Sequence, residues 1–128
     1  MTDALADTSF FIGRESGRPM HVDRVPERLG VSFVTIGELR TGLLTAVDAD
    51  SRSRRLRTLL VALSLDPIPV NDAVAEAWAR LQVNLRDRNH RMPVNDSWIA
   101  ATAIALRVPV VTQDDDYANI PGLDVIHV

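Results

Sequence analysis

The sequence predicts a single α/β domain in which a central parallel sheet is flanked by helices on both faces. Short β-branched runs alternate along the chain with segments of helical periodicity, which is the pattern of strands joined by crossover helices. The chain of 128 residues has the length of one ordinary domain. No repeat or low-complexity linker divides it, so residues 1–128 are expected to form one folding unit.

The first half of the chain is expected to hold two strand-to-helix units and a third helix. Residues 4–7 are predicted to form a strand that leads into a helix over Thr8–Arg14, followed by a polar loop. Residues 31–34 are β-branched or aromatic, which predicts a second strand. The next helix has apolar side chains at helical spacing, namely Ile36, Leu39, Leu43 and Val47. An arginine-rich helix is expected over Arg52–Leu63, and the prolines of residues 66–70 suit an edge segment.

The second half is expected to hold two helices and two strands. Asn71 or Asp72 is placed to cap a helix with one apolar stripe, formed by Val74, Trp78, Leu81 and Leu85. Asn95–Arg107 is rich in alanine, which lets a helix pack close to a sheet. Val110–Thr112 and Val125–Val128 are the last predicted strands.

The composition excludes several classes of protein. The chain has no cysteine, which removes disulfides, thiolate zinc sites and cysteine nucleophiles and suits a cytoplasmic location. All of its basic residues are arginine, so a Walker A loop and Schiff-base chemistry lack their lysine. The chain has three histidines, His21, His90 and His127. They lie too far apart in the sequence to form the paired histidines of a zinc-protease helix. No targeting segment is expected, and Trp98–Leu106 is too short to span a membrane.

Acidic side chains follow the predicted strands where their carboxyl ends should meet. Asp7 ends the first strand, and Asp114 follows the third by two residues. Glu38 is expected in the first turn of the helix after the second strand, and Asp96 opens the alanine-rich helix on its buried face. Because ligands bind at this edge of open α/β sheets, the four carboxylates are expected to converge there.

Each of these acids also has a purely structural explanation. Aspartate is a favoured N-cap, so Asp7 could simply cap the first helix. Thr35 and Glu38 have the spacing of a capping box. Asp96 stands near a helix start, and Asp114–Asp116 could be a solvated acidic turn. Taken one at a time, the acids leave both explanations open.

A divalent metal ion would account for the recurrence of acids at one edge of the sheet. Two like charges about 4 Å apart repel by about 4 kcal/mol at an effective dielectric constant of ~20. The chain has no lysine to offset that repulsion. Oxygen ligands without histidine or cysteine select Mg²⁺ or Mn²⁺ over zinc, so Mg²⁺ is the expected cofactor and Mn²⁺ a possible substitute.

Four stretches of the chain resemble a known family. They are Leu5–Ser9, Thr35–Gly42, Asn95–Ala103 and Val110–Tyr117, with the sequences LADTS, TIGELRTG, NDSWIAATA and VVTQDDDY. In this order and spacing, from residue 4 to the end, the chain resembles a PIN domain and more narrowly the VapC toxins of type II toxin–antitoxin systems. The resemblance implies a PIN-like magnesium-dependent endoribonuclease in which a cognate antitoxin blocks activity and homodimers are common.

The resemblance also suggests which residues hold the metal ion and carry catalysis. The acidic quartet of the family falls on Asp7, Glu38, Asp96 and Asp114. Asp116 matches a further metal-binding acid of a T-x-D-x-D-F pattern, in which Tyr117 replaces phenylalanine here. Whether Asp114 or Asp116 is the ligand stays open.

RNA, the implied substrate, has to be held by a chain whose formal net charge is −3. Two arginine clusters are candidates for phosphate and base contacts, Arg52, Arg54, Arg55 and Arg57 in one and Arg86, Arg88 and Arg91 in the other. Three hydroxyl side chains are expected to orient the carboxylates, those of Thr8, Ser9 and Thr112. The alternatives are a non-catalytic partner-binding α/β module and another acid-pocket phosphohydrolase, which would normally need a lysine.

Overall fold

Four parallel strands form the central sheet of the computed structural model, which describes residues 1–128. The strands are β1 (Ala4–Ala6), β2 (Leu29–Val31), β3 (Val110–Thr112) and β4 (Val125–His127). Their order across the sheet is β2-β1-β3-β4, and every pairing is parallel. The carboxyl ends of the strands therefore share one edge, as predicted.

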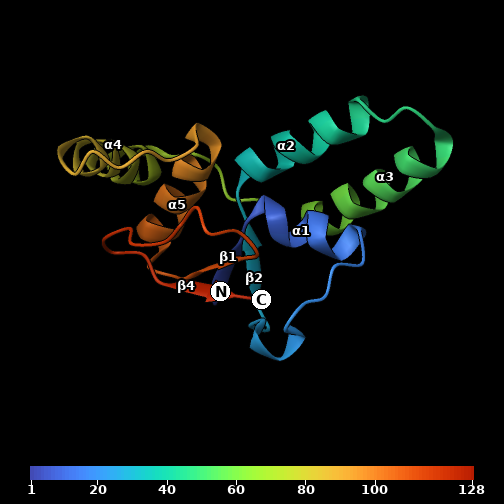
Figure 1. Ribbon diagram of the computed structural model, residues 1–128, viewed down its shortest axis with the longest axis horizontal. Helices are drawn as coiled ribbons and strands as arrows, with labels where there is room; N and C mark the ends of the chain where they lie inside the picture. Colours follow the sequence, from blue (N-terminus) through green and yellow to red (C-terminus); the bar gives the residue numbers. More distant parts are fainter.

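Five α-helices and one short 3₁₀ helix surround the sheet. They are α1 (Thr8–Glu15), η1 (Val22–Arg24), α2 (Phe33–Leu44), α3 (Ala49–Leu63), α4 (Asp72–Asp87) and α5 (Val94–Leu106). Figure 1 shows α4 and α5 on one side of the strands and α1 and α3 on the other, with α2 above them. The fold is thus the predicted α/β arrangement with helices on both faces. None of the helices combines the length and the apolar character needed to cross a membrane.

Each face of the sheet has its own apolar core. On one face, α1, α2 and α3 pack Phe11, Ile36 and Leu59 against alternate residues of the strands. On the other face, α4 and α5 bury Leu81 and Ile99 together with side chains from the segment after β3. Because these cores fix both faces, the residues that follow β1 and β3 are held rigidly at the carboxyl edge.

The second strand and its helix differ from the prediction over residues 31–34. The strand ends at Val31, and the Ser32 side chain caps α2 by accepting a 3.0 Å hydrogen bond from the backbone N–H of Val34. The helix stops at Leu44, so that Val47 lies outside it and is 93% exposed. The sequence predicts Glu38 in the first turn of α2. Because α2 begins at Phe33, Glu38 instead lies in its second turn.

The N-caps of α4 and α5 decide between alternatives that the sequence left open. Asn71, and not Asp72, caps α4 by accepting a 3.0 Å hydrogen bond from the backbone N–H of Val74. Pro93 occupies the cap position of α5 and makes no side-chain cap bond. The capping explanation for Asp96 is therefore wrong, and its carboxylate is free for another role.

Candidate metal centre

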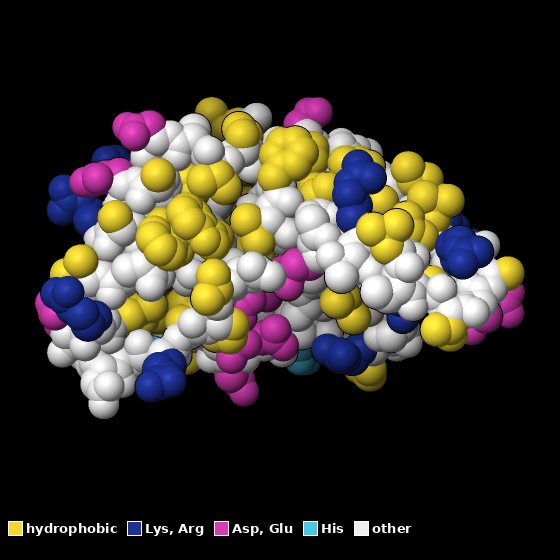
Figure 2. Space-filling view, turned by 90° about the horizontal axis from the view of Figure 1, so that it is seen from above, with side chains coloured by type: hydrophobic (Ala, Val, Ile, Leu, Met, Phe, Trp, Pro, Cys, Tyr) yellow, Lys and Arg dark blue, Asp and Glu magenta, His cyan; other side chains and the backbone are white.

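A hollow of about 270 Å³ opens at the carboxyl edge of the sheet, and the four predicted acids all line it. Its lining, here called the acidic hollow, consists of Asp7, Thr8, Ser9, Ile12, Arg18, Glu38, Asp96 and Asp114. Figure 2 shows acidic side chains gathered near the middle of the face seen from above. Residues separated by more than a hundred positions in the sequence thus meet at one place because β1 and β3 are neighbours in the sheet.

Asp7 is buried at the base of the acidic hollow and has both carboxylate oxygens engaged. Its Oδ1 accepts hydrogen bonds from the Ser9 hydroxyl (2.7 Å) and the backbone N–H of Phe10 (3.0 Å), and its Oδ2 accepts one from the Thr112 hydroxyl (2.6 Å). Burial raises the pKa of the Asp7 carboxyl, while the three hydrogen bonds oppose that rise. Asp7 caps α1 and lines the hollow at once, so the two explanations hold together.

Glu38 is held by α1 and not by its own helix. The Thr8 hydroxyl donates a 2.6 Å hydrogen bond to Oε1 of Glu38 and lies 3.0 Å from the hydroxyl of Thr35. The predicted capping box between Thr35 and Glu38 is wrong, because Ser32 is the cap and Thr35 is already inside α2. Thr8 orients Glu38, as Ser9 and Thr112 orient Asp7.

Asp96 has the most perturbed carboxyl of the hollow. Its pKa rises to about 7, because burial disfavours the charged form and Asp116 lies against it, with the charges of Asp7 and Glu38 adding to the effect. The Tyr117 hydroxyl approaches Oδ1 of Asp96 at 3.4 Å, a long contact. A carboxyl with so perturbed a pKa, lying in a hollow beside other acids, makes Asp96 a candidate functional residue.

The loop after β3 fixes the position of Asp114. The backbone N–H of Asp114 donates to the Thr112 hydroxyl (2.9 Å), and the backbone N–H of Gln113 donates to the Ser9 hydroxyl (2.9 Å). Burial raises the pKa of the Asp114 carboxyl, and the charge of Arg18 opposes this. Asp116 is exposed and outside the lining of the hollow, although it contacts Asp96.

No arginine neutralises these carboxylates by an ion pair. The ion pairs of the chain lie elsewhere, between Arg28 and Asp3, Arg80 and Glu76, and Arg86 and Asp87. Arg18 reaches the lining from the loop after α1. Neither Arg18 nor Ile12 was expected from the sequence to line the hollow, and the contact between Thr35 and Thr8 was not expected either. A loop arginine carries no periodic or motif signal that could have placed it.

The residues of the acidic hollow fit Mg²⁺ in their donor chemistry. All of its acidic ligand candidates offer oxygen, which Mg²⁺ prefers. No three acidic or histidine side chains lie close enough together to form a direct ligand shell. Mg²⁺ keeps several waters and uses one or two direct carboxylates, so spaced acids suit it better than a closed cage would.

Comparison with known proteins identifies the family. The model of the PIN domain matches residues 4–123, and the chain therefore belongs to the PIN domain family. Among its relatives, ribonuclease VapC4 of Mycobacterium tuberculosis is 49% identical over 124 residues, which cover 96% of this chain and 95% of the relative. Within the PIN domain family, the chain belongs with the VapC ribonucleases, which confirms the resemblance seen in its sequence.

Further matches agree with this placement. Ribonuclease VapC5 of M. tuberculosis is 44% identical over 116 residues, which cover 91% of this chain and 86% of the relative. The crystal structure of VapBC-5 from M. tuberculosis, a member of the VapBC family of toxin–antitoxin systems, superposes with a TM-score of 0.89 at 38% identity and covers 98% of each chain. The predicted PIN-like fold is thus confirmed over nearly the whole chain.

Proposed function

We propose that the chain is a metal-dependent endoribonuclease that acts as the toxin of a type II toxin–antitoxin pair, with residues 1–128 as one catalytic domain. The observation that carries this proposal is the convergence of Asp7, Glu38, Asp96 and Asp114 in one hollow without an ion-paired arginine. The names of the relatives, ribonucleases VapC4 and VapC5, support RNA as the substrate.

The acidic hollow would hold Mg²⁺, or Mn²⁺ in its place, through one or two of its four carboxylates directly and through the others by way of bound water, with Asp116 next to Asp96 as a fifth acid. When bound, such an ion stabilises negative charge on a phosphodiester and lowers the pKa of an attacking water. The chain itself supplies the orientation. Thr8, Ser9 and Thr112 fix carboxylate oxygens by hydrogen bonds of 2.6 to 2.7 Å, so little rearrangement is needed when ligands bind.

The same hollow suits recognition by an antitoxin. Solved relatives include VapBC toxin–antitoxin assemblies, which supports a cognate antitoxin as the protein partner. A guanidinium from that partner would pair bidentately with the unneutralised carboxylates and cover the site. The homodimer and the cytoplasmic location that are expected from the sequence stay predictions.

The proposal is tested by measuring cleavage of single-stranded RNA and thermal unfolding across a Mg²⁺ titration. Cleavage should require Mg²⁺ or Mn²⁺ and stop in excess chelator. Metal at ~100 times its dissociation constant should raise the free energy of unfolding by about 2.7 kcal/mol per site. A flat melting temperature with no cleavage would instead support a non-catalytic partner-binding module.

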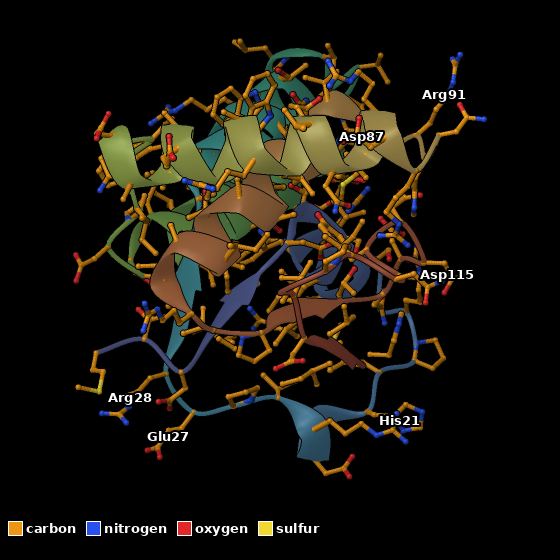
Figure 3. All side chains as sticks on the ribbon, turned by 90° about the vertical axis from the view of Figure 1, so that its left-hand side faces the viewer. His21, Glu27, Arg28, Asp87, Arg91 and Asp115 are labelled. Carbon is orange, nitrogen blue, oxygen red and sulfur yellow. The ribbon has the colours of Figure 1, made fainter.

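We expect Asp114 to matter more for activity than Asp116. Asp114 lines the acidic hollow and is tied to Thr112, whereas Asp116 is exposed two residues further along the loop. At saturating metal, Asp114→Asn should therefore lower kcat/KM for RNA more than Asp116→Asn does. Asp115→Asn is the matched control, since Figure 3 shows Asp115 at the edge of the molecule and its side chain does not line the hollow. A larger loss in Asp116→Asn would make Asp116 the ligand.

A further inference from the structure

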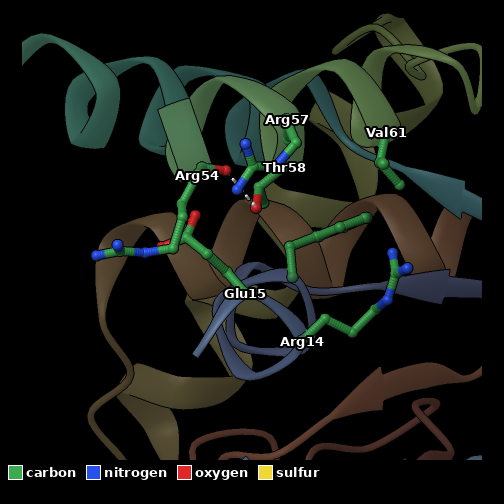
Figure 4. A pocket seen from close by; sticks show the side chains of 7 residues that line it. Arg14, Glu15, Arg54, Arg57, Thr58 and Val61 are labelled. Carbon is green, nitrogen blue, oxygen red and sulfur yellow. Dashed lines mark hydrogen bonds between the residues drawn. The ribbon is translucent and has the colours of Figure 1, made fainter. Parts of the chain in front are cut away.

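A second hollow, of about 250 Å³, lies between α1 and α3 and is rich in arginine. Arg54, Arg57 and Thr58 come from α3 and face Arg14 and Glu15 of α1 across it (Figure 4). Phe11 and Val61 complete its lining. We call it the arginine hollow.

The guanidinium groups of the arginine hollow have no acidic partner. Arg14, Arg54 and Arg57 are exposed and form no ion pair, and Glu15 is the one carboxylate in the lining. Three cations against one anion leave an excess positive charge at this place. Such a surface binds an anion with several acceptor oxygens, because each guanidinium presents a fork of donors.

Two of the three arginines in the other predicted cluster are already engaged. Arg86 pairs with Asp87 at 3.4 Å, and Arg88 donates a 3.0 Å hydrogen bond to the backbone oxygen of Asn119. Arg91 extends away from the ribbon in Figure 3. On α3, Arg54 donates a 3.3 Å hydrogen bond to the Ser51 hydroxyl and Arg55 donates to the backbone oxygen of Gly42. The α3 cluster therefore keeps Arg52 and Arg57 without a partner, whereas the other cluster keeps only Arg91.

The arginine hollow is connected to the acidic hollow along α1. A third hollow of about 250 Å³ shares Ile12 and Glu38 with the acidic hollow and Glu15 with the arginine hollow. From Asp7 to Arg14 the helix rises by about 10 Å at 1.5 Å per residue. A flexible strand that enters the acidic hollow can therefore reach the arginines without leaving the surface.

We propose that the arginine hollow binds a backbone phosphate of single-stranded RNA at a distance from the bond that is cut. This inference rests on the proposed function, which makes RNA the occupant of the acidic hollow. A backbone phosphate has two non-bridging oxygens, which can accept hydrogen bonds from guanidinium groups on both helices. A polyanion also repeats its charge along its length, so one strand supplies phosphates to both hollows.

The test measures binding of a labelled mixed-sequence RNA of about 20 nucleotides, longer than common single-strand sites, to an Asp96→Asn background. The probe variant is Arg14→Gln with Arg57→Gln, which removes one arginine from each helix. The matched control is Arg40→Gln with Arg107→Gln, an equal charge change at exposed arginines outside both hollows and both arginine clusters. We expect the probe variant to weaken binding about tenfold and the control less than about twofold.

The salt dependence of binding gives a second readout. Loss of one phosphate contact should reduce the slope of log K against log salt by about 0.7. Arg57→Lys should keep that slope and lose part of the affinity, because lysine retains the charge without the fork. Melting temperatures of the variants check that each one folds.

Two outcomes would overturn the inference. Equal losses in the probe and control variants would indicate general attraction, and unchanged RNA affinity with weaker antitoxin binding would make the hollow a site for acidic peptide. Failure of the proposed function is seen separately, as absence of cleavage by the unmodified chain in Mg²⁺. In that case, selective loss of RNA binding in the probe variant would still establish the phosphate site.

Discussion

Asp96→Asn is expected to remove RNA cleavage while it stabilises the metal-free protein. Replacing a hydrogen-bond partner of a metal ligand commonly costs 10- to 100-fold in activity or metal affinity, so loss of a proposed ligand should exceed about 100-fold in kcat/KM. Burial and neighbouring acids disfavour the charged form of Asp96, and asparagine removes that charge. The activity loss is measured on single-stranded RNA in Mg²⁺, and the unfolding free energy in chelator.

The stabilisation should depend on pH in a defined direction. The pKa of Asp96 is about 7 in the folded chain and about 3.9 in an unfolded one. Ionisation of Asp96 therefore destabilises the wild type progressively as pH rises from about 4 to about 7. An asparagine at this position does not ionise, so the variant does not lose this stability. The variant should equal the wild type near pH 4 and exceed it by about 1 to 2 kcal/mol at pH 8, a range discounted for the half-exposed side chain.

Two further variants separate this explanation from a structural one. Asp87→Asn, on the exposed surface of α4, should leave cleavage unchanged. Asp7→Asn should abolish cleavage but lower stability by about 1 kcal/mol, because both oxygens of Asp7 accept hydrogen bonds and an amide nitrogen cannot. If Asp96→Asn unfolds the chain as it loses activity, the residue is structural and the metal-centre assignment is wrong.

The carboxyl edge of the sheet was predictable because it depends on topology more than on exact boundaries. Parallel strands place Asp7 and Asp114 at one edge whichever residue ends each strand. The start of α2 was not predictable in the same way. Phe33 and Val34 favour strands by intrinsic propensity, and the Ser32 cap and the packing of α2 override that preference. Thr35 and Glu38 have the spacing of a capping box, but no capping box forms there because α2 begins earlier, at Phe33.

The cationic parts of both hollows depend on contacts that sequence spacing does not encode. Arg18 reaches the acidic hollow from a loop. Arg14 faces Arg54 and Arg57 only because α1 and α3 pack on the same face of the sheet. The number of arginines on α3 can be counted in the sequence, but which of them share a hollow with α1 cannot be predicted from it. Only the folded arrangement distinguishes a solvated helix face from a binding surface.

Cleavage by this chain is expected to leave a 5′-phosphate and a free 3′-hydroxyl. Attack by the RNA 2′-hydroxyl requires a general base and acid with pKa values near neutrality, usually histidines. The lining of the acidic hollow contains no histidine. His21 precedes η1, His90 follows α4 and His127 lies in β4, and none of the three lines the hollow.

Attack by water does not involve the 2′-hydroxyl, and this gives the clearest test of the route. An RNA with a single 2′-deoxy substitution at the scissile nucleotide should still be cut at the same bond, with end groups identified by mass spectrometry of the fragments. The unsubstituted RNA is the matched control. A 2′,3′-cyclic phosphate end, or cleavage that persists in excess chelator, would exclude the metal-dependent route. Because the acidic hollow offers carboxylates and hydroxyls but no imidazole, the nature of the cut end reports directly on the chemistry that these side chains support.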